Sequence, residues 1–581
     1  MRRITVLVLL CVVMFAQVLT AEELSQPIYE VIEELDVKVE MRDGVRLSTN
    51  IYRPDTEGKF PAVLARTPYN GIWSKFEFLA QCGYVVLIQD TRGTYESEGV
   101  FNPFHDESDD GYDTIAWVAN QPWCNGSVGM TNASYVGHTQ WMAALTNPPA
   151  LKTIIPTVAC IDLYDVAYFG GAFKLSLWTI WSPAQIAPYN QRNNPNWRAE
   201  LDEYIKAVPL LDIDKQIGWR VSNLRDWFSH PEEDRYWDIY NVKDNLSTVR
   251  TSSLIIACWF DFFLKANLNS YIGMTKKSIS PDIRKKQKLL ICPAGHGIPR
   301  DPITKYGDID FGKGSYTDYE ALHIRWFDSE LKGIDNGIWD EPPVKIFIMG
   351  DNVWRYENEW PLARTEYTKY YFESNGKANA NSEGGRISTS IPRSTQNDSY
   401  TYDPRNPVPS SPDGSVFNPF ANFPIDHRPL YSREDILLYT TDTLENSLEV
   451  TGPVEVILYA SSSSVTTDFT AKLLDVYPDG RSMYVCDGII RATHRNGPVN
   501  TTFIEPDKIY EYTIDLAATS NVFKKGHQIR VEISSSNFPR FDRNLNTTLN
   551  NALATEMVTA TQTIYHDKDH PSCIILPVIP R

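Results

Sequence analysis

Residues 128–144 read Val-Gly-Met-Thr-Asn-Ala-Ser-Tyr-Val-Gly-His-Thr-Gln-Trp-Met-Ala-Ala, and this stretch decides the fold. It predicts a short apolar strand, a tight turn centred on Ser134 and a helix that starts near Val136. A serine on such a turn projects its hydroxyl beyond the sheet, where the first N–H groups of the helix favour negative charge. That arrangement is a nucleophile elbow. The alternative is an ordinary helix cap, because Asn132 stands where an elbow usually has glycine.

Strand and helix patterns alternate around this turn. Apolar runs at 60–65, 83–90 and 151–156 are typical of buried strands, and 107–120 has a helical pattern. Residues 37–53 alternate on both sides of a short turn and predict a hairpin. This succession predicts an α/β fold with a doubly wound, mostly parallel sheet.

The pattern changes after the sheet segments. Residues 162–247 are rich in aromatic residues and show no strand pattern, which predicts a helical cap inserted over the sheet. A packed helical domain without a role in binding is the alternative. The α/β domain is then expected in two parts, 22–161 and 248–350. Short alternating strands and turns rich in Gly and Pro predict an all-β jelly roll or sandwich over 351–581.

Residues 1–21 have the composition of a signal peptide. Met1-Arg2-Arg3 is positive, an apolar run follows, and Ala21 offers a cleavage point before two glutamates. We expect an exported protein, secreted or periplasmic, that leaves the membrane after cleavage. An uncleaved membrane anchor is the alternative.

The net charge and the spacing of the cysteines exclude some classes of partner and ligand. The formal net charge of −18 disfavours a nucleic-acid partner, since phosphate binding needs an excess of Lys and Arg. No two cysteines form a C-x-x-C pair, so we expect no thiolate metal site, and no motif requires a cofactor. The sequence leaves the oligomeric state open, with a homodimer as one alternative.

Two polar residues follow the resumed strand patterns. Asp261 comes after the apolar run 253–259, and His296 comes after 288–293. Ligand sites of open parallel sheets lie beyond the carboxyl ends of the strands, so we expect both residues near Ser134. The chain order Ser, Asp, His is that of α/β-hydrolases. The serine needs a base, an imidazole titrates near neutral pH, and a carboxylate fixes its tautomer.

Several motifs are similar to those of one enzyme family. They are Met41-Arg-Asp-Gly-Val-Arg-Leu47, Arg66-Thr-Pro-Tyr69, Gln89-Asp-Thr-Arg-Gly93, Trp259-Phe-Asp261, Gly295-His296 and, near the C-terminus, Asp487-Gly-Ile-Ile-Arg491. In these the chain resembles the cocaine esterase and X-prolyl dipeptidyl peptidase serine hydrolases, also called CocE/NonD hydrolases.

The resemblance implies an α/β-hydrolase with an inserted cap and a C-terminal jelly roll. It implies Ser134 as nucleophile, Asp261 as the acid and His296 as the base. The oxyanion hole would consist of the Tyr69 hydroxyl and the Tyr135 backbone N–H.

The leading hypothesis is a serine hydrolase for carboxylic esters with an aromatic or bulky apolar acyl group. It rests on the aromatic residues of the cap and of the segment around Asp261, and the candidate pocket residues are Phe263, Trp259, Trp178 and Trp181. The alternatives are an acylase, an α-amino acid ester hydrolase or an X-prolyl dipeptidyl peptidase. A hypothesis of another class is a catalytically inactive protein whose jelly roll binds carbohydrate or a partner.

Overall fold

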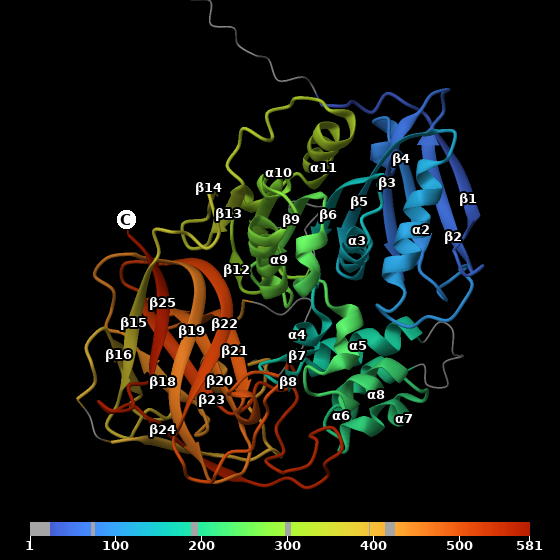
Figure 1. Ribbon diagram of the computed structural model, residues 1–581. Helices are drawn as coiled ribbons and strands as arrows, with labels where there is room; N and C mark the ends of the chain where they lie inside the picture. Colours follow the sequence, from blue (N-terminus) through green and yellow to red (C-terminus); the bar gives the residue numbers. More distant parts are fainter. Residues whose placement is uncertain are drawn as a thin grey trace, which may run out of the picture.

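The computed structural model describes residues 24–70, 76–186, 196–296, 304–393, 396–412 and 424–580. The expected signal peptide lies outside the described residues. Figure 1 shows an α/β domain at the top, a helical cap beneath it and an all-β domain beside both. None of the helices in these described ranges combines the length and apolarity that a bilayer crossing requires.

The α/β domain is built on a 10-stranded sheet in the order β1-β2-β4-β3-β5-β6-β9-β10-β13-β14. From β4 to β13 all neighbours are parallel, as predicted, whereas β1, β2 and β14 pair antiparallel at the two edges. Its strands are β1 (Val31–Glu40), β2 (Arg46–Pro54), β3 (Phe60–Thr67), β4 (Val85–Asp90), β5 (Cys124–Ala133), β6 (Leu151–Thr157), β9 (Ser252–Cys258), β10 (Gln287–Cys292), β13 (Val344–Ile348) and β14 (Val353–Glu357).

Helices cover both faces of this sheet because successive strand residues point to opposite sides. In β3, Ala62 and Leu64 pack with α2 and α3, whereas Val63 packs with α1 and α11. The central strands β3, β4, β9 and β10 are buried on both faces, which explains their continuous apolar runs. The helices are α1 (Glu77–Gln81), α2 (Glu107–Ala119), α3 (Tyr135–Leu145), α9 (Leu264–Lys277), α10 (Pro281–Lys285) and α11 (Tyr319–Phe327).

The segment between β6 and β9 is mainly helical. Its helices are α4 (Leu163–Ala167), α5 (Leu175–Ile186), α6 (Trp197–Tyr204), α7 (Ile213–Ile217) and α8 (Ser222–Ser229), followed by short 3-10 turns. The sequence did not predict the ribbon of β7 (Tyr168–Phe169) and β8 (Ala172–Phe173), because two residues per strand leave no alternating pattern. Its turn, Gly170-Gly171, has positive φ, and a Cβ on Gly170 would lie 2.0 Å from the Ile489 carbonyl oxygen. The ribbon therefore needs glycine to pack against the β domain.

The all-β domain contains 11 strands in one hydrogen-bonded set around a single apolar core. They are β15 (Glu366–Glu373), β16 (Gly385–Ser388), β17 (Asp398–Tyr402), β18 (Leu437–Thr440), β19 (Leu448–Ser462), β20 (Asp468–Val476), β21 (Ser482–Arg491), β22 (Tyr510–Phe523), β23 (Gln528–Ser534), β24 (Ala560–Tyr565) and β25 (Cys573–Ile579). The first sheet extends beyond residue 350, where the sequence placed its end, because β14 closes the edge against β13.

Candidate active site

Ser134 lies on a strained turn between β5 and α3. Its backbone has φ 63° and ψ −125°, and Asn132 two residues earlier has φ 102°. A non-glycine residue in such a conformation costs about 1 to 3 kcal/mol and is frequent at functional sites. The Ser134 N–H donates to the Thr157 carbonyl at 2.9 Å, which ties the turn to β6. The helix begins at Tyr135, one residue before the predicted start.

The turn also requires a close approach of α3 to the segment after β6. A Cβ on Gly137 would lie 2.5 Å from the Ala159 Cβ, so only glycine fits this contact. Asn132 stands in place of the usual elbow glycine, and its side-chain oxygen accepts from the Ala133 N–H at 2.8 Å. Asparagine tolerates positive φ better than most residues, and this local bond accompanies it.

His296 connects Ser134 to Asp261. The loops after β9 and β10 carry Asp261 and His296, and these strands are parallel neighbours, so their carboxyl ends lie side by side. The His296 Nδ1 is 2.5 Å from the Asp261 Oδ2, and the Nε2 is 2.9 Å from the Ser134 Oγ. The Asp261 side chain is fully buried, and the imidazole is 9% exposed.

This geometry can activate a hydroxyl. A proton on Nδ1 donates to the carboxylate and leaves the Nε2 lone pair to accept the serine proton. The Asp261 Oδ1 accepts from the Phe263 N–H at 2.6 Å, which fixes the carboxylate. Phe262 stacks on the imidazole, with ring centroids 4.2 Å apart and an interplanar angle of 22°. The imidazole is thus held in its plane as well as at both nitrogens.

Tyr69 places a phenol beside Ser134. Its oxygen accepts from the Trp181 indole N–H at 2.9 Å. Burial raises the pKa of Tyr69 to about 12, although hydrogen bonding with Trp181, Ser134 and the Tyr135 backbone lowers it. The phenol therefore keeps its proton at neutral pH. Trp181 donates to the Tyr69 oxygen. The phenol proton of Tyr69 can therefore point toward the negative charge that develops on an oxygen next to Ser134.

The side chain of Tyr135 anchors the start of α3. Its hydroxyl donates to the Glu107 Oε1 at 2.6 Å and accepts from the Phe104 N–H at 2.8 Å. Glu107 also pairs with Arg66 at 2.7 Å, and both side chains of this ion pair are buried. Burial raises the pKa of Glu107, against the effects of Arg66 and Tyr135. Because Arg66 lies on β3 just before Tyr69, this network ties the two candidate oxyanion donors to one buried carboxyl group.

A small pocket opens beside the Ser134 hydroxyl. Three of the four predicted pocket residues line it: Trp178 and Trp181 from α5, and Phe263 from the loop after β9. The sequence missed Phe104, Cys160, Leu177 and Phe262. Phe262 could have been found by its place next to Asp261, whereas Phe104, Cys160 and Leu177 carry no local signal.

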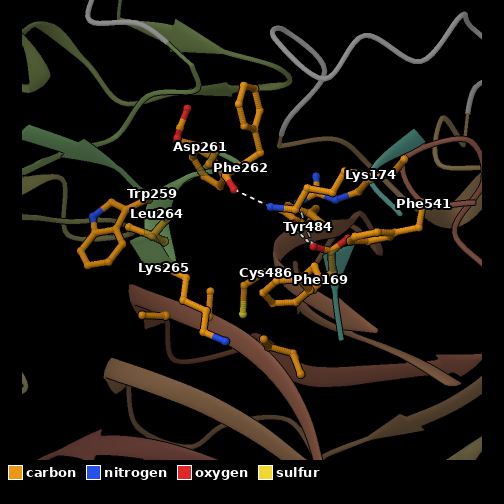
Figure 2. A pocket seen from close by; sticks show the side chains of 16 residues that line it. Phe169, Lys174, Trp259, Asp261, Phe262, Leu264, Lys265, Tyr484, Cys486 and Phe541 are labelled. Atoms are coloured by element: carbon orange, nitrogen blue, oxygen red, sulfur yellow. Dashed lines mark hydrogen bonds and ion pairs between the residues drawn. The ribbon is translucent and has the colours of Figure 1, made fainter. Parts of the chain in front are cut away.

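Trp259 does not line this pocket, which corrects the prediction. Its indole N–H donates to the Phe347 carbonyl at 2.8 Å, and its ring packs against Trp360. The side chain of this residue leaves the strand end on the far side of Asp261. Figure 2 shows it at a second cavity, with Leu264 and Lys265.

The described residues contain no cluster of three or more His, Cys, Asp or Glu side chains that could hold a metal ion. The described residues bring together a hydroxyl, a base, a carboxylate, a phenol and a helix N-terminus next to one apolar pocket. These groups fit acyl transfer to a serine.

Two family models match the chain. The X-Pro dipeptidyl-peptidase (S15 family) model matches residues 43–298, and the X-Pro dipeptidyl-peptidase C-terminal non-catalytic domain model matches residues 336–575. Cocaine esterase of Rhodococcus sp. (strain MB1 Bresler) is 39% identical over 578 residues, covering 94% of this chain and 98% of the relative. The chain belongs to the cocaine esterase and X-Pro dipeptidyl-peptidase (S15) family of serine hydrolases.

Two solved structures share this fold over 95% or more of the chain. An α-amino acid ester hydrolase aligns with a TM-score of 0.82 at 25% identity and covers 97% of this chain and 99% of its own. An aminopeptidase from the archaeon Thaumarchaeota archaeon aligns with a TM-score of 0.81 at 26% identity, with coverages of 95% and 97%. The predicted family and the predicted fold class, an α/β-hydrolase followed by an all-β domain, are confirmed.

Proposed function

We propose that this S15 serine hydrolase cleaves carboxylic esters through an acyl-enzyme intermediate on Ser134. In this proposal His296 takes the Ser134 proton as the hydroxyl attacks the ester carbonyl, and Asp261 stabilises the imidazolium that forms. The Tyr69 hydroxyl and the Tyr135 N–H donate to the oxyanion. His296 then protonates the leaving alcohol, and water releases the acid by the reverse sequence.

One observation carries this proposal: the continuous hydrogen-bonded path from Ser134 through His296 to Asp261, at 2.9 and 2.5 Å. The path starts at a hydroxyl on a strained turn next to a helix N-terminus. Those are the positions that nucleophile, base and orienting carboxylate need.

The pocket favours an uncharged aromatic or bulky apolar acyl group. Its described lining consists of aromatic rings, Leu177, Cys160 and the Ser134 hydroxyl. Burial raises the pKa of the Cys160 thiol to about 12, so this wall is neutral as well. An apolar acyl group gains from burial against these rings, whereas an ammonium group would lose its hydration there.

The alternatives with an amino-acid substrate need a different pocket. Aminoacyl esters and the N-termini of peptides carry an ammonium group, which needs a carboxylate partner when it is buried. Among the described residues that line the pocket, none is acidic. We therefore place the α-amino acid ester hydrolase and dipeptidyl peptidase activities behind ester hydrolysis, whereas the acylase alternative stays open.

A panel of chromogenic substrates tests the proposed activity. Purified protein should hydrolyse p-nitrophenyl benzoate with a higher kcat/KM than p-nitrophenyl acetate, and both far better than alanyl or glycyl-prolyl p-nitroanilide. A preference for either anilide would replace ester hydrolysis with an aminopeptidase or dipeptidyl peptidase activity.

We also propose that the protein is exported. The support is the composition of residues 1–21, a positive start, an apolar run and a small residue before two glutamates. Expression of the full sequence, followed by mass spectrometry of the N-terminus, should find mature protein that begins near Glu22 outside the cytoplasm. Uncleaved protein in the membrane fraction would instead support an anchor.

A further inference from the structure

A second cavity lies behind Asp261, where the α/β domain, the cap and the β domain meet (Figure 2). It is a small cavity of about 40 Å³. The loop after β9 forms one wall, β21 and Arg540 form another, and Phe169 and Lys174 enter from the β7–β8 ribbon. The lining does not include Ser134, and Phe262 separates this cavity from the pocket beside Ser134, since it lines both.

Lys174 extends from the ribbon to the loop that carries Asp261. Its side chain is buried, and the ammonium group donates to the Phe262 carbonyl at 2.8 Å (Figure 2). The backbone around it is fixed, since the Lys174 N–H donates to the Ala167 carbonyl at 2.9 Å and the Phe173 N–H donates to Asp542 at 2.8 Å. This segment of the cap is hydrogen-bonded to the β domain, and it places the Lys174 ammonium group on the loop that carries Asp261.

The Phe262 carbonyl, which accepts from Lys174, belongs to the short loop that positions both Asp261 and His296. Phe262 is between Asp261 and Phe263, and its ring stacks on His296 at 4.2 Å. The next N–H, of Phe263, donates to the Asp261 carboxylate at 2.6 Å. A shift of the Phe262 carbonyl would therefore move the carboxylate and the stacking ring together.

Lys174 differs from the other cations of the cavity. Lys265 pairs with Asp515 at 2.8 Å, and Arg540 pairs with Asp487 at 3.1 Å. In the described part of the chain, no carboxylate lies within 4.0 Å of the Lys174 ammonium group. Its electrostatic interaction with Asp261 is longer in range, and it acts on the side of the triad opposite to Ser134.

Positively and negatively charged side chains both lie around the Lys174 ammonium group. Burial, with smaller effects of Arg540 and Lys265, lowers the pKa of Lys174 to about 7, against the effects of Asp261 and Asp165, which raise it. The ammonium form therefore prevails below neutral pH and decreases above it. Among the described residues, the charged and titratable groups around Lys174 and its cavity include Asp165, Asp261, Lys265, Tyr484, Cys486, Asp487, Arg540 and, on the Phe173 N–H, Asp542.

We propose that Lys174 is a positioning residue for the Asp261–Phe263 loop and supplies positive charge behind the Asp261 carboxylate. Through this contact the cap and the β domain determine the geometry of the catalytic groups. The inference rests on the proposed function of Ser134, His296 and Asp261. A positive charge at this position repels an imidazolium, so removing it should favour the protonated imidazole.

The experiment compares Lys174→Met and Lys174→Gln with the matched control Lys265→Met. Lys265 lines the same cavity and, like Lys174, places its ammonium group on the Phe169 ring, but its ion pair is with Asp515. Each protein is assayed for kcat and KM on one ester, for the pH dependence of kcat/KM, and for Tm.

Lys174→Met should lower kcat by roughly 10- to 100-fold with little change in KM, because small displacements of reacting groups have effects of this size. Lys174→Gln can still donate to the Phe262 carbonyl, so it should retain more kcat. Both variants lack the charge, so the acid limb of kcat/KM should move to higher pH in both. Lys265→Met should change neither property.

A Lys174→Met enzyme with wild-type kcat and an unmoved acid limb would overturn the inference, as would an equal loss in Lys265→Met. If Lys174→Met fails to fold, an unmoved acid limb in Lys174→Gln is the overturning result. Ser134→Ala is measured in parallel. An active Ser134→Ala enzyme would refute the proposed function, whereas an inactive one beside unaffected Lys174 variants would refute this inference alone.

Discussion

A serine, a histidine and an aspartate lie in contact in both domains of this protein. In the α/β domain, His296 is the central member, with one nitrogen on Asp261 and the other on Ser134. In the β domain, Asp398 is the central member. It accepts from the Ser374 hydroxyl at 2.7 Å and lies 2.8 Å from the His566 Nε2.

The order of contacts gives the two groups different chemistry. The Ser374 hydroxyl donates to a carboxylate, and the His566 nitrogen that faces it, at 3.4 Å, is the same one that binds Asp398. His566 therefore cannot act as a relay between serine and aspartate. Asp398 also accepts from the Tyr439 hydroxyl at 2.8 Å and the Ala378 N–H at 3.0 Å. Such a carboxylate is a structural acceptor.

Access separates the two groups as well. His566 and Asp398 have no exposed surface, whereas Ser134 lies at a pocket and His296 is 9% exposed. Burial acts to raise the pKa of Asp398, but its bonds with His566, Ser374 and Tyr439 lower it below the usual value. An aspartate of this kind stabilises the fold above its unfolded-state pKa, and that stability is lost as the pH falls through the folded-state pKa. The comparison teaches that residue types alone do not define a nucleophilic site.

The largest expected difference between the groups is the effect of removing each serine. Ser134→Ala should lower kcat for ester hydrolysis by roughly 10⁴-fold or more, because it removes the nucleophile. Circular dichroism and Tm should show a folded protein. Residual activity within about tenfold of wild type would refute the role of Ser134.

The two aspartates should respond differently to the same change. Asp261→Asn should lower kcat by roughly 10⁴-fold with little change in KM, since it favours the wrong imidazole tautomer. Asp398→Asn is the matched control, and it should lower the free energy of unfolding while leaving kcat intact. A raised KM with unchanged kcat in Asp261→Asn would make Asp261 a substrate-binding carboxylate.

The phenol of Tyr69 should contribute less than either triad member. Tyr69→Phe removes one transition-state donor and leaves the Tyr135 N–H, so kcat should fall by about 10²- to 10³-fold, or about 3 to 4 kcal/mol. KM should stay nearly constant. If the ring alone matters, Tyr69→Phe will be almost fully active and Tyr69→Ala will raise KM.

The smallest effect on activity is expected at Ser374. Ser374→Ala removes a donor to a buried carboxylate and should lower the free energy of unfolding by about 1.5 to 3 kcal/mol, with kcat and KM unchanged. Denaturant unfolding beside a steady-state assay measures both. A loss of kcat in folded Ser374→Ala would contradict the structural role of this group.

The sequence predicted the parallel sheet and the elbow, because buried strands and tight turns leave local patterns. The residues at the edges of the active site were not predicted correctly, because contacts between distant segments determine which side chains reach it. Trp259 is two residues before Asp261 in the chain, yet its indole N–H donates to the Phe347 carbonyl. Phe104 and Leu177 reach the pocket from loops and helices whose own sequence shows only packing residues.

The contact of Lys174 with the catalytic loop could not be predicted from the sequence for the same reason. Its neighbours in the chain give no sign that its ammonium group reaches Phe262, since that contact needs the β7–β8 ribbon to pack against β21. A two-residue strand has no periodicity for sequence analysis to detect. The role of the junction between the α/β domain, its cap and the β domain could be inferred only from the assembled fold.

Labelling with a fluorophosphonate probe tests the central claim most directly, because the probe reacts only with a serine that a base has activated. After labelling, digestion and mass spectrometry locate the adduct. We predict modification of Ser134, none of Ser374, and loss of labelling in Ser134→Ala. An adduct on Ser374, or an unlabelled Ser134 in protein that still hydrolyses esters, would contradict the account.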